Sequence, residues 1–204
     1  MDILKIGTKV IEKEIEAIEK ISRELDENFV SAINSIHDCK GRVIFTGLGK
    51  SGHIGKKLAA TFASTGTPAS FVHATEALHG DLGMITKDDI VIAISNSGET
   101  KDILDMIPSL NLIGAKIISI TSNEKSSLAI KSEIHIKVDT KKEADHLNLA
   151  PTSSTTAVLA VGDAMAVVLS ILKDFKKENF AVFHPGGSLG KALLGEKILK
   201  GEDL

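Results

Sequence analysis

Three hydroxyl-bearing residues within six positions form a loop that could hold a phosphate group. The loop Ser95-Asn-Ser-Gly-Glu-Thr100 directly follows an apolar run at residues 89–94, which is typical of a buried strand. Ser95, Ser97 and Thr100 supply the hydroxyls, and the next helix begins with free backbone N–H groups. Ligands bind beyond the carboxyl ends of strands in open α/β sheets, so the loop predicts an anion site. The hydroxyls could instead serve only as helix caps.

A second loop, Gly47-Leu-Gly-Lys-Ser-Gly52, is rich in glycine and also separates an expected strand from an expected helix. It fits the G-x-G-x-x-G pattern of dinucleotide sites, but the next strand ends in Phe71-Val-His73, without the acidic residue that holds a ribose. A P-loop would need glycine where the chain has Ile44. The loop therefore presents Lys50 and the Ser51 hydroxyl, either to a small phosphorylated ligand or as a tight turn with a solvated lysine.

The composition narrows the classes of protein that fit. The 204 residues include 24 Lys plus Arg and 27 Asp plus Glu, a formal net charge of −3, which argues against a nucleic-acid binder. The only arginines are Arg23 and Arg42, so phosphate binding must rely on lysine, hydroxyls and backbone N–H groups. No uncharged apolar run approaches the roughly 20 residues of a membrane span. The single cysteine, Cys39, cannot form an internal disulfide, and we expect a cytoplasmic protein.

Further titratable residues lie in loops and in glycine-rich surroundings elsewhere in the chain. Those that could take part in chemistry are His73, His79, Glu143 and His184. We interpret His37 and His135 as structural or solvated, as lone histidines usually are. The sequence alone does not bring the selected residues into one site.

The elements that must position these residues alternate along the chain. Short β-branched runs predict five strands, at residues 42–46, 69–72, 89–94, 116–120 and 134–138. Helices are predicted at residues 3–38, as one bent helix or two, and then up to residue 62, at 100–112 and at 153–172. The alternation indicates an α/β fold, with a five-stranded parallel sheet flanked by helices on both faces. We expect one domain over residues 1–204, with an N-terminal helical segment at 1–40 and a sheet-containing core at 41–204.

The N-terminal helical segment carries an apolar stripe. Leu4, Ile11, Ile18 and Leu25 recur every seven residues, as on one face of a helix. The stripe could belong to the core, or it could pack on another subunit and make the protein an oligomer.

Six stretches, in the right order along essentially the whole chain, resemble the sugar isomerase (SIS) domain family. They are GLGKSGHIG at 47–55, ATFASTGTP at 60–68, HGDLGM at 79–84, ISNSGE at 94–99, LAPTSSTT at 149–156 and HPGGSLG at 184–190. The chain is most similar to the branch of D-arabinose 5-phosphate isomerases that serve the 3-deoxy-manno-octulosonate (Kdo) pathway of lipopolysaccharide biosynthesis. It resembles the short form of that branch, which lacks a pair of regulatory CBS modules. A natural short form and a truncated chain both fit.

The resemblance implies a homotetramer with sites at subunit interfaces, acting on a small sugar phosphate without a cofactor. The family's catalytic positions fall on Lys50, Asp102, Glu143 and His184. Asp102 replaces a family glutamate that is one methylene longer, and neighbouring Glu99 could substitute for it.

The resemblance also implies contacts to the substrate. These positions fall on Gly66, Thr67, His73 and His79. His73 further matches a position where the family can bind zinc, as an inhibitory metal.

The implied reaction interconverts D-ribulose 5-phosphate and D-arabinose 5-phosphate through an enediolate, which requires a carboxylate base of near-neutral effective pKa. We expect Glu143 to be this base, Lys50 to stabilise the enediolate and His184 to shuttle a proton. The phosphate would lie on hydroxyls of Ser51, Ser95, Ser97 and Thr100, and we expect Glu99 of the same loop to contact the substrate.

Two alternatives remain open. The protein could be another isomerase of this family, acting on a hexulose or heptulose phosphate. It could also be a sugar-phosphate sensor without catalysis. Such sensors usually carry a DNA-binding helix-turn-helix, whereas the roughly 40 residues before the first expected strand are acidic and lack a basic recognition helix.

Overall fold

The structure is a computed structural model, which describes residues 1–187. Its sheet contains five parallel strands in the order β2-β1-β3-β4-β5. The strands are β1 (Val43–Gly47), β2 (Ala69–His73), β3 (Ile90–Ile94), β4 (Lys116–Thr121) and β5 (Ile134–Lys137). Each lies within one residue of its predicted bounds, so the predicted α/β fold is confirmed.

The order of the strands creates a crevice beside β1. β1 pairs with β2 on one side and with β3 on the other, so Gly47 is aligned with both His73 and Ile94. Helix α3 (Gly49–Ser64) follows β1 and packs on one face of the sheet, whereas α5 (Lys101–Ile113) follows β3 and packs on the opposite face. The carboxyl ends of β1 and β3 therefore flank the topological switch point, where ligands bind in such sheets.

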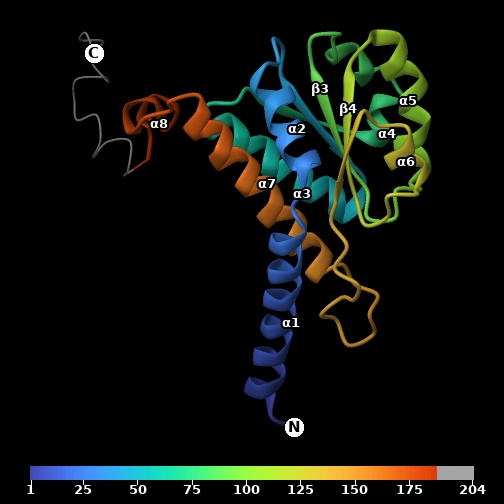
Figure 1. The fold of residues 1–204 in the computed structure, drawn as a ribbon, viewed down its shortest axis with the longest axis vertical. Helices are drawn as coiled ribbons and strands as arrows, with labels where there is room; N and C mark the ends of the chain where they lie inside the picture. The colour runs from blue at the N-terminus through green and yellow to red at the C-terminus, as the bar shows by residue number, and fades with distance from the viewer. Residues whose placement is uncertain (188–204) are drawn as a thin grey trace.

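Alternate residues of each strand feed two separate cores. Phe45 packs on one face against α3 and against helices α2 (Glu27–His37) and α7 (Ser153–Leu172). Ile44, its neighbour, packs on the other face, where α5 is joined by α4 (Ala74–Ala77) and α6 (Ser127–Ile130). Figure 1 shows these helices on the two sides of the sheet.

Helix α1 (Ile3–Glu24) extends beyond the carboxyl edge of the sheet, with the N-terminus at its far end (Figure 1). It is separate from α2, which begins where the Asp26 side chain accepts a hydrogen bond from the Asn28 backbone at 2.9 Å. The buried residues of α1 are Ala17 and Ile21. Much of the apolar stripe instead faces outward, since Leu4 is 81% and Ile11 62% exposed, so these residues do not join the core of their own chain.

Among residues 1–187, one helix, α7, is long and apolar enough to cross a membrane by length and composition alone. It is the helix predicted at residues 153–172. The charged residue Asp163 lies near its middle. Its buried residues, such as Val161 and Leu169, pack on the sheet with α3, as those of a core helix do.

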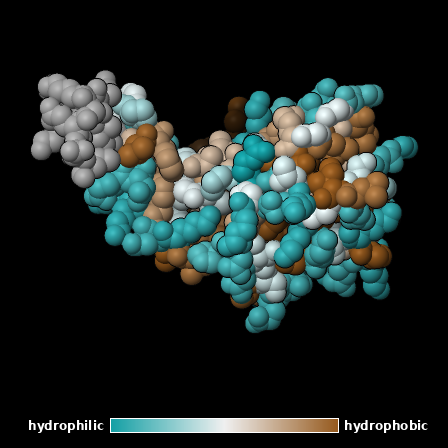
Figure 2. Space-filling model, turned by 90° about the horizontal axis from the view of Figure 1, so that it is seen from above, coloured by the Kyte–Doolittle hydropathy of each residue, from teal (hydrophilic) through white to brown (hydrophobic). Residues whose placement is uncertain are grey.

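Four short elements were not predicted, because a turn or two of helix shows no periodicity. They are α4, α6, the 3₁₀ helix η1 (Asp81–Met84) and α8 (Lys177–Phe183). Viewed from above, the surface at the amino-terminal edge of the sheet is mostly hydrophilic, with smaller hydrophobic patches (Figure 2). Residues 188–204, including the end of the HPGGSLG stretch, lie outside the described part of the chain.

Candidate active site

The carboxyl edge of the sheet gathers the loops that the sequence singled out. The turn after β1 carries Lys50 and Ser51, and the loop after β3 carries the serine loop, which we define as residues 95–100. The longer loop between β5 and α7 carries Glu143 and lies at the same end of the molecule (Figure 1). These three predicted regions therefore meet at one edge.

The glycine-rich turn brings the end of β1 close to the start of α3. A Cβ atom on Gly52 would lie 2.9 Å from the Gly47 carbonyl oxygen, too close for a side chain to fit without movement. Gly49 has a φ of +56°, which favours glycine. The helix therefore begins immediately after the strand, with Lys50 exposed and Ser51 half-buried.

The serine loop is shaped by its own hydroxyls. Ser95 is buried, its Oγ accepts a hydrogen bond from the Gly98 backbone at 3.1 Å, and it lies 2.8 Å from the Thr100 Oγ1. Gly98 has a φ of +69°, and the side chain of Ser126 fills the space that a Cβ would need. The hydroxyls of Ser95 and Thr100 thus hold the loop together, whereas Ser97 is exposed.

The segment after β4 fixes the serine loop from the other side. The Ser122 backbone N–H and Oγ both donate to the Asn96 carbonyl oxygen, at 2.9 and 2.7 Å. The Ser127 backbone N–H donates to Glu99 Oε1 at 2.7 Å, and this bond lowers the pKa of the Glu99 carboxyl. Glu99, expected to bind substrate or to replace Asp102, therefore binds α6 in this structure.

Glu143 is held by the first residues of α7. Its Oε2 accepts hydrogen bonds from the Thr152 backbone at 2.7 Å, the Thr152 Oγ1 at 3.1 Å and the Ser154 backbone at 3.2 Å. Its Oε1 accepts a hydrogen bond from the Ser154 Oγ. The carboxylate thus occupies the N-terminus of a 20-residue helix, a favourable place for a negative charge.

The expectation of a near-neutral base is wrong in direction for Glu143. Burial raises the pKa of this carboxyl, but the hydroxyls and backbone N–H groups of Ser154 and Thr152 together lower it below its ordinary value. These donors stabilise the charged form. Glu143 is therefore ionised at neutral pH in this arrangement.

Two neighbouring cavities lie between the serine loop and the loop that carries Glu143. One of about 40 Å³ is lined by Ser51, Asn96 and Ser154, among others. The other, of about 260 Å³, is lined by Asn96, Ser122 and Glu143. Asn96 therefore faces both, and neither it nor Ser122 was singled out from the sequence. The position of Asn96 between two candidate serines was a usable signal, but the contact of Ser122 with it depends on the pairing of β3 and β4.

Asp102, His73 and His79 lie beside this edge, near the end of β2. Asp102, in the first turn of α5, accepts a hydrogen bond from the Thr75 Oγ1 at 3.3 Å. His73 ends β2, and its Nδ1 is buried with no hydrogen-bond partner in the described chain. His79 is exposed just after α4.

Three further predicted residues lie at the opposite end of α7. Lys173, at the C-terminus of α7, donates to the Thr67 Oγ1 at 3.1 Å, and Phe175 fills the space that a Cβ on Gly66 would need. His184 follows α8 and stacks on Phe180, with ring centroids 3.9 Å apart. Because 20 helical residues rise about 30 Å, one chain does not bring Gly66, Thr67 or His184 to Glu143.

Within residues 1–187, no group of three or more His, Cys, Asp or Glu side chains is arranged to hold a metal ion.

Comparisons with known proteins identify the family of the chain. The SIS domain profile matches residues 35–168. Arabinose 5-phosphate isomerase KdsD of Francisella tularensis is 54% identical over 194 residues, which cover 94% of this chain and 58% of that protein. The protein of the same name from Pseudomonas aeruginosa is 47% identical over 204 residues, which cover 100% of this chain and 61% of that protein. The chain thus spans less than two thirds of the length of these curated relatives.

A solved structure is similar over nearly its whole length. The structure of Escherichia coli CFT073 c3406 in complex with arabinose 5-phosphate has a TM-score of 0.88 and 49% sequence identity, and the match covers 90% of this chain and 98% of that chain. A sugar-phosphate isomerase structure from Listeria monocytogenes has a TM-score of 0.84 and 36% identity, covering 91% of this chain and 100% of that one.

Proposed function

The chain belongs to the SIS domain family, and from this premise we propose that it interconverts D-ribulose 5-phosphate and D-arabinose 5-phosphate. The observation that carries the proposal is the identity of 47% and 54% to arabinose 5-phosphate isomerases over 94% or more of the chain. The convergence of the serine loop and Glu143 on one cavity supports it independently.

The phosphate of the substrate binds at the switch point. Exposed Ser97, half-buried Ser51 and the first backbone N–H groups of α3 and α5 supply donors there without arginine. Ser95 and Thr100 contribute by holding the loop in shape, since their hydroxyls bond to each other. Asn96 extends the row of donors toward Glu143.

The proton moves between C1 and C2 at the other end of the cavity. Glu143 is ionised and accepts it, while the Lys50 ammonium stabilises the negative charge of the enediolate. Four hydrogen bonds to Glu143 weaken it as a base, so part of this network must loosen when substrate binds. Asp102, with one hydrogen bond from Thr75, is the alternative acceptor.

The complete site forms between copies of the chain. His184, Gly66 and Thr67 are separated from Glu143 by about the length of α7, so a second copy supplies them. Thr67 and Gly66 are covered by Lys173 and Phe175, so these two covering side chains must move for the contact to form. The exposed apolar residues of α1, including Leu4, Ile11 and Ile15, supply a surface for this assembly. We expect a homotetramer, and light scattering that returned the monomer mass of 21.6 kDa would contradict it.

The proposal also covers the pathway, the cellular compartment and the effect of metal ions. The product enters the Kdo pathway of lipopolysaccharide biosynthesis in the cytoplasm, without a cofactor. Zinc acts as an inhibitor at His73, whose buried Nδ1 lacks a partner in the described chain. EDTA should therefore preserve or raise activity, and inactivation by EDTA with rescue by zinc would contradict this assignment.

The decisive experiment compares substrates of different length. Purified protein is incubated with D-ribulose 5-phosphate, D-fructose 6-phosphate or sedoheptulose 7-phosphate, and aldose formation is followed by NMR. We expect turnover of ribulose 5-phosphate, with arabinose 5-phosphate as product. Preferred turnover of a longer ketose phosphate would assign another isomerase activity, and binding without turnover of any of them would assign a sensor.

A further inference from the structure

Two lysines of α1 bond to the backbone on either side of Glu143. The Lys20 Nζ donates to the Asp139 carbonyl oxygen at 2.7 Å, and the Lys13 Nζ donates to the Ala144 carbonyl oxygen at 3.4 Å. The two lysines are separated by about two helical turns, so they project from the same face of α1. Together they bracket residues 139–144, which we call the base segment.

The base segment does not pack closely on α1 between these two bonds. A cavity of about 380 Å³ separates them, lined by Lys13, Glu16, Ala17, Lys20 and residues 140–143. Across such a gap there is little dispersion attraction to hold the segment in one place. Among the described residues, the two lysine bonds are the hydrogen bonds that join the segment directly to α1.

Lys20 is the stronger of the two connections. Its side chain is 26% exposed, and its ammonium also pairs with Glu24 at 2.5 Å on the same helix. The ion pair with Glu24 helps to orient the ammonium toward the Asp139 carbonyl oxygen. Lys13 is exposed, and its bond to the segment is longer.

We propose that Lys20 is a positioning residue for the isomerase reaction, because it fixes the Asp139 end of the base segment and thereby the Glu143 carboxylate. This inference rests on the proposed function. The other end of the segment is tied to α7 through Thr152 and Ser154. Val138, just before the segment, is buried and its N–H donates to the Thr121 carbonyl oxygen at 2.8 Å. On the Asp139 end of the segment itself, the Lys20 bond is the second fixed point. It acts through the backbone and does not touch the substrate.

The expected effect is on the rate of the chemical step. A displacement of about 1 Å in a reacting group can cost on the order of 10²-fold in rate. Loss of one of two fixed points should cost less, about 10-fold in kcat. Because the serine loop that anchors phosphate is held by other bonds, from Ser122 and Ser127, KM should change little.

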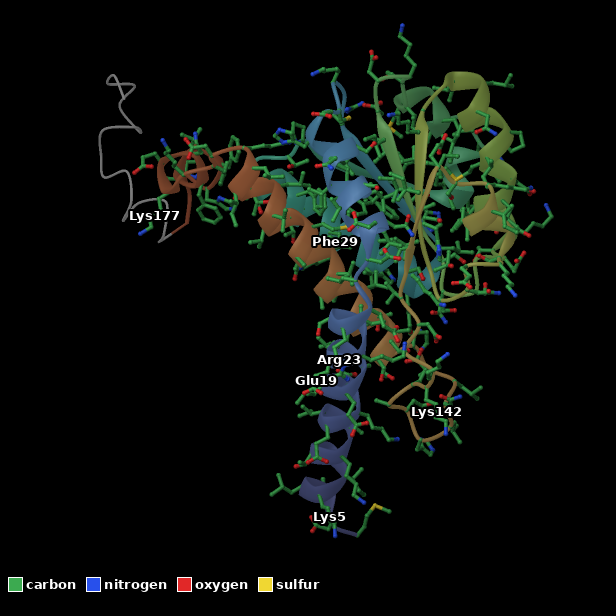
Figure 3. The ribbon with its side chains drawn as sticks, viewed as in Figure 1. Lys5, Glu19, Arg23, Phe29, Lys142 and Lys177 are labelled. Atoms are coloured by element: carbon green, nitrogen blue, oxygen red, sulfur yellow. The ribbon has the colours of Figure 1, made fainter. Side chains whose placement is uncertain are left out.

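The test compares three variants of the full chain. Lys20→Met removes the ammonium and keeps the aliphatic stem, and Lys20→Arg keeps a cationic donor. Arg23→Met is the matched control on the same helix, because the Arg23 side chain is 69% exposed and pairs with Glu19 at 3.7 Å. Among the described residues it makes no hydrogen bond to the base segment, in the loop that carries Lys142 (Figure 3). For each, kcat and KM are measured with ribulose 5-phosphate, and amide hydrogen exchange is measured for peptides covering 139–148.

We expect Lys20→Met to lower kcat and to speed exchange in 139–148, Lys20→Arg to retain most of both wild-type values, and Arg23→Met to match wild type. Wild-type kcat and exchange in Lys20→Met would overturn the proposal, as would an equal loss in Arg23→Met. If Lys20→Met does not fold, Lys20→Gln replaces it. If the wild type does not turn over ribulose 5-phosphate, the proposed function fails, while unchanged exchange in Lys20→Met would separately exclude the positioning role.

Discussion

The two ends of α7 differ in what they offer a ligand. At the N-terminal end, Ser154 bonds to Glu143, and both line cavities that open beside the serine loop. At the C-terminal end, Thr67 is buried and bonded to Lys173, and Phe175 closes the space over Gly66. The N-terminal end presents polar groups around open space, whereas the C-terminal end is packed.

This difference explains why residues implied by one family pattern fall into two groups. The residues proposed to bind the phosphate and to move the proton lie at the carboxyl edge of the sheet, where a parallel α/β fold leaves open loops. Those at the C-terminal end of α7, with His184 beyond them, lie about 30 Å away. Under the proposed function, a single chain would hold two partial sites, which the proposed assembly would join.

Glu143→Gln should have the largest effect of any single change at the N-terminal end. Glutamine keeps the shape but removes the basic oxygen, so kcat should fall on the order of 10²–10⁴-fold with little change in KM. Steady-state kinetics and exchange of the C1 or C2 hydrogen in deuterated water measure this. Because glutamine also disturbs the contacts to α7, Ser154→Ala serves as the control that perturbs the network and keeps the carboxylate. Wild-type exchange in Glu143→Gln would transfer the role of base to Asp102.

Gly66→Ala should show that the C-terminal end is intolerant of added volume. Gly66 has a φ of +94°, and a methyl group there would collide with the Phe175 ring. We expect a loss of about 1–3 kcal/mol in the free energy of unfolding, measured by urea denaturation. Gly83→Ala is the matched control, because a Cβ at Gly83 meets nothing within 4 Å. Equal stability of the two variants would mean that this end is not packed as described.

The pH dependence of the rate should give the smallest effect, and it tests whether Glu143, held as in this structure, is the base. A base must be ionised to act, and the pKa of Glu143 is lowered from an ordinary value of 4.5. Activity that depends on Glu143 should therefore be lost only as the pH falls through this lowered pKa. After correction for the second ionisation of the substrate phosphate, at about pH 6, kcat/KM should show no acid limb above about pH 4.5. An enzyme acid limb near neutral pH that remains after this correction would argue that Glu143, held as here, is not the base.

The sequence predicted the sheet well because its signals are local. The apolar runs at β3 and β4 and the glycine and serine loops that end the strands are continuous in the chain, so their order determines which edge carries them. The sequence left open whether the α1 stripe belongs to the core or to an interface. The structure divides it, because Leu4 and Ile11 are exposed whereas neighbouring Ile21 is part of the core.

The pKa of Glu143 and the separation between Glu143 and His184 could not be predicted, because they depend on contacts that no local sequence pattern encodes. The pKa of Glu143 is lowered by hydroxyls and N–H groups 9 and 11 residues further along the chain. Gly66 is constrained by Phe175, which is far away in the sequence. The distance between Glu143 and His184 follows from the direction of α7, which only the packed structure defines.

The most direct test of the divided site mixes two defective copies. Glu143→Gln and His184→Ala chains, carrying different affinity tags, are each assayed alone and then co-expressed, and doubly tagged oligomers are purified. If one copy supplies Glu143 and another His184, some sites in the mixed oligomer contain both wild-type residues, and ribulose 5-phosphate turnover should rise well above that of either variant. Doubly tagged oligomers with no more activity than the parent variants would contradict the account.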